Sequence, residues 1–312
     1  MMENQTVLKE FFIHGFSNSA KYTIVLFVIF LLIYLLGILG NLIIIIVIFK
    51  DVHLHTPMYY FICNLSSVDI FYTTVTLPKL MDIQLTGKIS MSFIQCFSQM
   101  YFFIFMGVTE VLLLSSMAYD RYIAICFPLQ YQYMMSNRKC ILIFVGIWMS
   151  ACGNALYMTG FASTLSFCHS NKLQQFFCDI KALSELSCAD MIIYVVVYVE
   201  TFFFGLCPFL LILISYVKII TGILHIRSKD GRRKAFSTCT SHLTVLFLFY
   251  ATILWLYTKP PIKHSEEIDQ VFSVLYTAVT PMLNPLIYSL RNKEIKDALI
   301  RLLVNSIKSW QT

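Results

Sequence analysis

The chain has 312 residues, of which 58% are hydrophobic and only 13% are charged, about half the charged fraction that is usual in soluble globular domains. A large core does not explain so low a value, so the composition argues against an ordinary soluble protein and favours the lipid bilayer as the solvent. The net charge of +6 does not indicate nucleic-acid binding, because the basic residues lie in short segments between apolar runs and form no continuous surface.

Seven apolar stretches are long enough to cross a bilayer, which takes roughly 20 residues of helix. Three of them contain a single Asp or Glu, and the other four contain no Asp, Glu, Lys or Arg. Backbone inside the hydrocarbon must satisfy its own hydrogen bonds, so each stretch is expected to be helical. The sequence therefore predicts an all-α membrane protein, a seven-transmembrane helix bundle, with spans at 22–49, 56–78, 89–119, 140–164, 191–217, 235–258 and 271–290.

The distribution of Lys and Arg predicts the orientation of the bundle. Fifteen of the 23 lie in alternate connections, beginning with the one after the first span and including the C-terminal tail. By the positive-inside rule these connections are cytoplasmic. The chain is then a single domain, residues 1–312, with an extracellular N-terminus at 1–22 and a cytoplasmic tail at 291–312. Asn4 begins an Asn-Gln-Thr glycosylation acceptor, which is usable only on the outer side and agrees with this topology.

Four of the ten cysteines fall on or beside the predicted outer face, where disulfides persist. They are Cys96, Cys168, Cys178 and Cys188. Four cysteines allow three pairings, and the residues alone do not choose among them.

The acids inside the spans are Asp69, Glu110 and Glu200. An isolated charge at the centre of a membrane costs at least about 2.5–3.5 kcal/mol, so such residues usually face a polar interior. Glu200 could bind a cation or a hydrogen-bond donor on a ligand, or it could be a neutral side chain bonded within the bundle.

Five motifs lie near the inner ends of the spans. In chain order they are LHTPMYY at 54–60, MAYDRYIAIC at 117–126 followed by FPLQY, SY at 215–216, KAFSTCTSHL at 234–243 and PMLNPLIYSLRNKE at 281–294. Together they resemble those of the olfactory receptors, a branch of the rhodopsin-like G-protein-coupled receptors, and the resemblance covers nearly the whole chain. The loop lengths are similar to those of the tetrapod-type class of that family.

The resemblance implies an odorant receptor of the plasma membrane. It would bind a small volatile or lipophilic molecule and activate a heterotrimeric G protein of the stimulatory, olfactory type, raising cyclic AMP. The alternative is a non-olfactory rhodopsin-like chemoreceptor for a small molecule. No cofactor is implied, apart from a possible sodium ion.

The resemblance also implies a G-protein switch at the inner face. Arg121, paired with Asp120 at rest, would be released on activation and meet the G protein, with Tyr216 and Tyr288 closing the rearrangement. Asn284 and Pro285 belong to the same switch. The alternative for Arg121 is an ordinary side chain that reaches the membrane surface.

A ligand pocket, a cation site and two disulfides follow from the same resemblance. The disulfides are Cys96–Cys178 and Cys168–Cys188. Asp69 and Glu110, with Asn41 and Asn284, would hold a monovalent cation, and the alternative is a protonated pair without an ion. The pocket is mostly apolar with a few hydroxyls, as suits a small lipophilic ligand, and comprises Phe103, Ile104, Gly107, Val108, Glu200, Thr201, Phe204, Tyr250, Ile253, Leu254, Tyr257 and Thr277.

After the last span, residues 293–304 predict a short amphipathic helix on the inner membrane surface. Ile295, Leu299, Leu302 and Leu303 would enter the interface between water and lipid. Lys293, Lys296 and Arg301 would face lipid headgroups.

Other functional classes fit the sequence less well. A transporter is expected to contain inverted repeats or broken helix pairs, and neither is evident. An opsin needs a Lys in the seventh span, and an amine receptor usually has an Asp in the outer third of the third, where Met100, Phe103 and Ile104 stand instead. An enzyme is not predicted, because no nucleophile–base pair or metal-ligand cluster has usable spacing.

Overall fold

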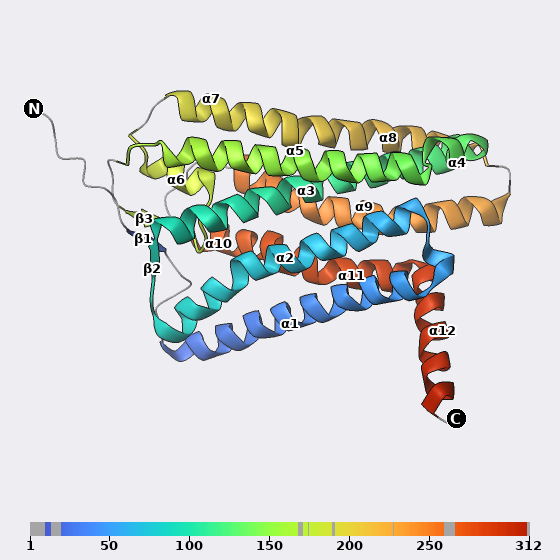
Figure 1. The fold of residues 1–312 in the computed structure, drawn as a ribbon, viewed down its shortest axis with the longest axis horizontal. Helices are drawn as coiled ribbons and strands as arrows, with labels where there is room; N and C mark the ends of the chain where they lie inside the picture. Colours follow the sequence, from blue (N-terminus) through green and yellow to red (C-terminus); the bar gives the residue numbers. More distant parts are fainter. Residues whose placement is uncertain are drawn as a thin grey trace, which may run out of the picture.

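The computed structural model describes residues 10–13, 20–167, 171–173, 175–188, 191–226, 228–258 and 266–310. Long helical rods run side by side along the longest axis of the molecule (Figure 1). In chain order the rods are α1 (Ala20–Lys50), α2 (Pro57–Thr86), α3 (Phe93–Cys126), α5 (Asn137–Ser163), α7–η3–α8 (Met191–Glu200, Thr201–Leu206, Cys207–Leu224), α9 (Lys229–Thr258) and α10–η4–α11 (Glu266–Val274, Leu275–Val279, Thr280–Arg291).

Each rod coincides with one of the predicted spans, so the seven-helix prediction is confirmed. By length and hydropathy alone, five of the described helices could cross a membrane: Tyr22–Lys50, Phe93–Cys126, Asn137–Ser163, Met191–Leu224 and Ile268–Ser289. The 30-residue α2 carries Asp69 and many hydroxyl side chains, and the apolar part of α9, Cys239–Trp255, is shorter. α2 and α9 nevertheless form the second and sixth rods of the bundle, as the second and sixth predicted spans require.

Several predicted helix ends were wrong. α2 continues through Pro78 to Thr86, because neighbouring side chains and helices in a membrane bundle compensate for the hydrogen bond that proline removes. α3 begins at Phe93 rather than at 89. Ser92 and Gln95 form a capping box at its start, which satisfies the first backbone donors of the helix.

A small sheet covers the end of the bundle that is predicted to be extracellular, here called the outer end, beside α6 (Ile180–Leu186). Its central strand is β1 (Glu10–Ile13), which pairs antiparallel with β2 (Ser90–Ser92) and parallel with β3 (Lys172–Leu173). Phe11 of β1 is fully buried, and its ring contacts that of Phe167 edge-on at 5.5 Å between centroids. Residues 10–13 are therefore part of the folded surface at this end, which the sequence did not predict.

The inner ends of the rods carry short elements: η1 (Val52–Leu54), η2 (Pro128–Gln130), α4 (Tyr131–Met134) and α12 (Lys293–Trp310). α12 leaves the bundle at a steep angle, as the predicted amphipathic helix would (Figure 1). It is longer than predicted, and two of its residues contact protein rather than lipid. Ile295 is 1% exposed, and Arg301 pairs with Asp51 at 2.6 Å.

The Asp51–Arg301 contact ties α12 to the first inner connection. Nε and Nη2 of Arg301 both donate to one Asp51 oxygen, at 3.0 and 2.6 Å. The Arg301 guanidinium lowers the pKa of Asp51 to about 2, so the ion pair is present throughout the physiological pH range. The hydroxyl of Tyr59 adds a second tie, donating to Glu294 at 2.6 Å.

Close packing of α1 against α11 depends on Gly40. A Cβ at this position would lie 2.9 Å from Cγ of Pro285, so a larger residue would separate the two helices. Small residues allow such close approach between membrane helices. Pro285, one of the predicted switch residues, is therefore held directly against the first rod.

Candidate functional site

A cavity of about 430 Å³ lies in the outer part of the bundle. Its walls come from α3, α7, η3, α8, α9 and η4, and the start of α6 covers it. The volume falls within the range of roughly 300–1,000 Å³ that small-molecule sites occupy.

Ten of the twelve predicted pocket residues line this cavity: Phe103, Ile104, Gly107, Val108, Glu200, Thr201, Phe204, Tyr250, Ile253 and Leu254. The side chain of Tyr257 lies outside the described residues. Thr277 is not among the lining residues. It is fully buried, and its hydroxyl donates to the Ser273 carbonyl oxygen at 2.8 Å.

The position of Thr277 follows from the π-helical turn η4. A π turn holds more residues than an α turn, so it changes which side chains of the helix face the cavity. Tyr276 therefore lines the cavity instead. Gly107 faces it across the cavity wall, since a Cβ at Gly107 would be in van der Waals contact with the Tyr276 hydroxyl oxygen at 3.4 Å.

Glu200 is the last residue of α7, immediately before the π-helical segment η3. Its side chain lines the cavity, and one carboxylate oxygen accepts a hydrogen bond from Nδ2 of Asn154 on α5 at 3.3 Å. The structure is therefore compatible with both alternatives for Glu200. The side chain is hydrogen-bonded within the bundle, and it also borders the cavity where a ligand could contact it.

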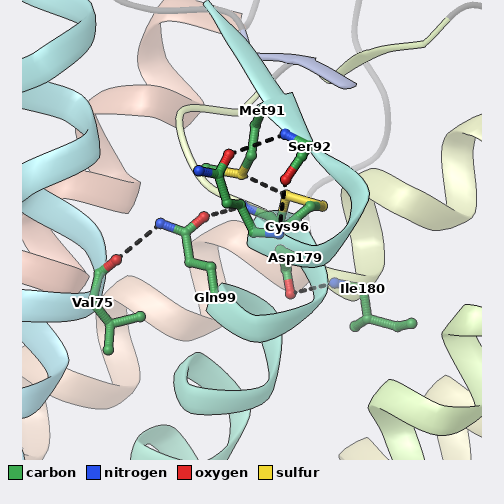
Figure 2. Close-up of a disulfide and its surroundings, with 9 residues drawn as sticks. Val75, Met91, Ser92, Cys96, Gln99, Asp179 and Ile180 are labelled. Atoms are coloured by element: carbon green, nitrogen blue, oxygen red, sulfur yellow. Dashed lines mark hydrogen bonds between the residues drawn. A yellow bond between two sulfur atoms is a disulfide. The ribbon is translucent and has the colours of Figure 1, made fainter. Parts of the chain in front are cut away.

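The covering of the cavity is held by the predicted Cys96–Cys178 disulfide, which the structure confirms. Figure 2 shows Gln99 beneath it, with Nε2 donating to the Val75 carbonyl at 2.9 Å and Oε1 accepting from the Cys178 amide at 3.0 Å. The ring of Phe177 then contacts that of Phe103 at 4.6 Å between centroids. The disulfide and Gln99 thus fix the loop to both α2 and α3.

The other outer cysteines are only partly described. Cys188 is disulfide-bonded, while its predicted partner Cys168 lies outside the described residues. The same holds for the predicted glycosylation site, Asn4. The Cys168–Cys188 pairing and the glycan remain predictions.

Asp69 and Glu110 are both buried deep in the bundle, each 1% exposed. Nδ2 of Asn284 donates to one Asp69 oxygen at 3.0 Å, and Asn41 donates to the Pro281 carbonyl at 3.1 Å. One side-chain oxygen of each of these four residues has no hydrogen-bond partner within the described chain. Four buried, unsatisfied oxygens on neighbouring helices match the hard ligands that a sodium ion takes. Within the described residues there is no cluster of three or more His, Cys, Asp and Glu side chains that could hold a metal.

At the inner end, Asp120 is fully buried and pairs with Arg121 at 3.3 Å. The hydroxyl of Tyr131 donates to the other Asp120 oxygen at 2.8 Å. Tyr216 on α8 bonds Nδ1 of His242 on α9 at 2.7 Å. Tyr288 is buried, and its hydroxyl has no partner within the described chain.

Several residues of these sites were not assigned a role from the sequence. Tyr131 and His242 stand inside two of the motifs, so their position was the available signal. Nothing in the sequence indicated a role for Asp179 or Gln99, except that they lie close to Cys178 and Cys96 in the chain.

The chain is similar to known proteins both in sequence and in fold. Residues 30–306 match the family model described as olfactory receptor. The chain is 46% identical over 300 residues to "Olfactory receptor 1" of Rattus norvegicus, with 96% of each chain covered. It is 44% identical over 303 residues to "Olfactory receptor 13C9" of Homo sapiens, with 95% of each covered. The crystal structure of squid rhodopsin is similar in fold, with a TM-score of 0.73 at 17% identity over 91% of this chain and 81% of that one.

Proposed function

The chain belongs to the olfactory receptor family, and from that membership we propose that it is an odorant receptor whose ligand occupies the cavity in the outer part of the bundle. It is a multi-pass membrane protein and a G-protein-coupled receptor, not an enzyme. The N-terminus is extracellular and the tail cytoplasmic, in the plasma membrane. The G protein is of the stimulatory, olfactory type, so activation raises cyclic AMP.

The cavity is the observation that carries this proposal. Aromatic and aliphatic side chains form most of its lining, with a few polar groups among them. Sites of this composition retain small lipophilic molecules by burial, while the polar groups set their orientation.

Activation follows from the contacts at the inner end. The Asp120–Arg121 pair and the Tyr216–His242 bond are contacts of the resting state. A ligand shifts the equilibrium only by binding the active arrangement more tightly. The inner ends of α8, α9 and α11 then move. Arg121 and Tyr216 leave these partners, and Arg121, Tyr216 and Tyr288 form new contacts around the G protein.

A screen of chemically diverse odorants tests the proposal. Cells that express the full chain with a stimulatory olfactory-type G protein and a cyclic AMP reporter should respond to at least one odorant, and cells without the receptor should not. A receptor that reaches the cell surface and never changes cyclic AMP across such a panel contradicts the proposed coupling.

A sodium ion held by Asp69, Glu110, Asn41 and Asn284 is the second part of the proposal. The ion would supply a positive charge to the four oxygens that have no hydrogen-bond partner within the described chain. These residues join α1, α2, α3 and α11, so the ion would stabilise the resting packing of those helices.

Replacing Asp69 with Asn should remove the effect of sodium on ligand potency. Exchanging external and internal sodium for a large organic cation should raise the potency of an agonist on the unmodified receptor several-fold, about the size of an ordinary allosteric coupling. The variant should show no such change. Asp82→Asn is the matched control, because Asp82 lies on the same helix but has a side chain that is 45% exposed and pairs with Lys79. Equal sodium sensitivity of receptor and Asp69 variant would rule out the site.

A further inference from the structure

We propose that the cavity selects a small lipophilic amine, bound as its ammonium ion with Glu200 as the counter-ion. The inference rests on the proposed function, in which this cavity is the ligand site, and adds the chemical class of the ligand. Three observations support it: the acidic side chains of the lining, the Tyr250 hydroxyl, which has no hydrogen-bond partner within the described chain, and the aromatic rings of the cavity walls.

The charged groups of the cavity are all acidic. Among its lining residues that the structure describes, Glu200 and Asp179 carry carboxylates, and none is Lys, Arg or His. A ligand carboxylate would therefore meet the like charge of Glu200 and no basic side chain of the lining. An ammonium ion would meet charges of the opposite sign in surroundings where water screens little.

The half-buried carboxylate of Glu200 has acceptor sites that no described protein group fills. A carboxylate has about four acceptor sites, and the hydrogen bond from Asn154 at 3.3 Å occupies one of them. That bond also directs the carboxylate, because Asn154 reaches it from a different rod, α5. A ligand ammonium has up to three N–H donors, which would fill the remaining acceptor sites and supply the missing positive charge.

Tyr250 provides independent evidence that a polar ligand belongs here. Its side chain is 7% exposed and lines the same cavity. The hydroxyl has no hydrogen-bond partner within the described chain. A buried polar group without a partner costs about 1–3 kcal/mol, and a ligand with a polar atom removes that cost.

The walls suit a cation as well as a hydrocarbon. Six aromatic rings line the cavity, from Phe103, Tyr198, Phe204, Phe209, Tyr250 and Tyr276. Aromatic faces attract an ammonium group within about 6 Å and also accept alkyl carbon. A neutral hydrocarbon would use the rings but leave Glu200 and Tyr250 unsatisfied, which is why the amine is favoured over an alkane of the same shape.

The acid stands on a different helix from the one considered in the sequence analysis. The outer third of α3 presents Met100, Phe103 and Ile104, whereas the carboxylate comes from the end of α7. A small outer pocket shares Phe103, Asp179 and Tyr276 with the main cavity and is also bordered by Lys181 and Asp269. Asp179 thus borders both spaces.

Matched ligands on the unmodified full chain give the first test. The probes are 2-phenylethylamine, hexylamine and cyclohexylamine, each paired with the corresponding alcohol, together with hexanoate as an anion. At least one amine should activate the cyclic AMP reporter at a concentration about tenfold or more below its alcohol, which is the ratio that corresponds to about 1.4 kcal/mol. Hexanoate should be inactive. Alcohols as potent as their amines would overturn the proposal.

Variants at Glu200 give the second test. Glu200→Gln keeps an acceptor for Asn154, so it should fold, and it should weaken the amine response by about tenfold or more. Alcohol responses should change less than about threefold, which also reports intact folding. Glu200→Asp should restore part of the amine response. Glu185→Gln, an exposed acid outside the cavity lining, should change neither. An unchanged amine response in Glu200→Gln would overturn the proposal.

Two further outcomes separate this inference from the proposed function. Responses to neutral odorants alone would reject the amine and leave the odorant receptor standing. Thermal stabilisation of the purified full chain by amines but not alcohols, without any cyclic AMP signal in cells, would support the amine and reject the coupling. The absence of both signals for every probe would reject both.

Discussion

Replacing Arg121 with alanine should reduce ligand-driven cyclic AMP production to the level of cells that lack the receptor. Arg121 is 17% exposed at the inner end of α3, where its guanidinium pairs with the fully buried Asp120. In the proposed mechanism this guanidinium leaves Asp120 and meets the G protein, and no other part of the switch supplies that charge. The measurement is reporter output at equal surface expression, with ligand binding measured in parallel.

Two companion variants make the Arg121 result interpretable. Arg138→Ala removes an exposed positive charge at the start of α5 and should leave signalling unchanged. Tyr131→Phe deletes the 2.8 Å hydrogen bond to Asp120 and should raise basal activity by about two- to tenfold, as expected for one hydrogen bond that favours the resting state. Full agonist responses from Arg121→Ala would mean that the guanidinium has no part in coupling.

The spans could be predicted from the sequence because length and apolar character are one-dimensional signals. A run of roughly 20 apolar residues needs no partner to be recognised. The strand β1 had no such signal. Its four residues are extended only because β2 and β3, which lie about 80 and 160 residues further along the chain, meet it at the outer face. Local sequence does not reveal which strands pair when they lie so far apart in the chain.

The residues that line the candidate cavity were likewise only partly predictable from the sequence. Ten of the twelve pocket residues that the resemblance implies line the cavity, and their role in ligand binding stays a prediction. Thr277 does not line the cavity; it lies in the π turn η4, where side chains are spaced differently around the helix than in an α turn. Asp179 was missed because it follows no helical periodicity. It reaches the cavity because the disulfide at Cys178 draws the loop over the bundle (Figure 2).

The loop that covers the cavity is anchored by the disulfide of Cys178. Replacing Cys178 with serine should therefore have a large effect. Removing a native disulfide typically costs about 2–5 kcal/mol, and the Cys96–Cys178 bridge joins residues 82 apart in sequence. The variant should lose most of its surface expression, and the fraction that reaches the surface should lose ligand response. Surface immunostaining and thermal unfolding of the purified full chain measure the two effects.

The comparison with other cysteine variants separates the bridge from the thiol. Cys207→Ser replaces a half-buried free cysteine on α8 and should behave as the unmodified chain. The double variant Cys96→Ser with Cys178→Ser should be no less stable than Cys178→Ser alone, because both lack the same bond. Gln99 still binds the Cys178 backbone in the double variant, so some order of the loop should remain. A Cys178→Ser receptor with normal expression and potency would show that Gln99 and the aromatic contact of Phe177 with Phe103 hold the covering of the cavity without the disulfide.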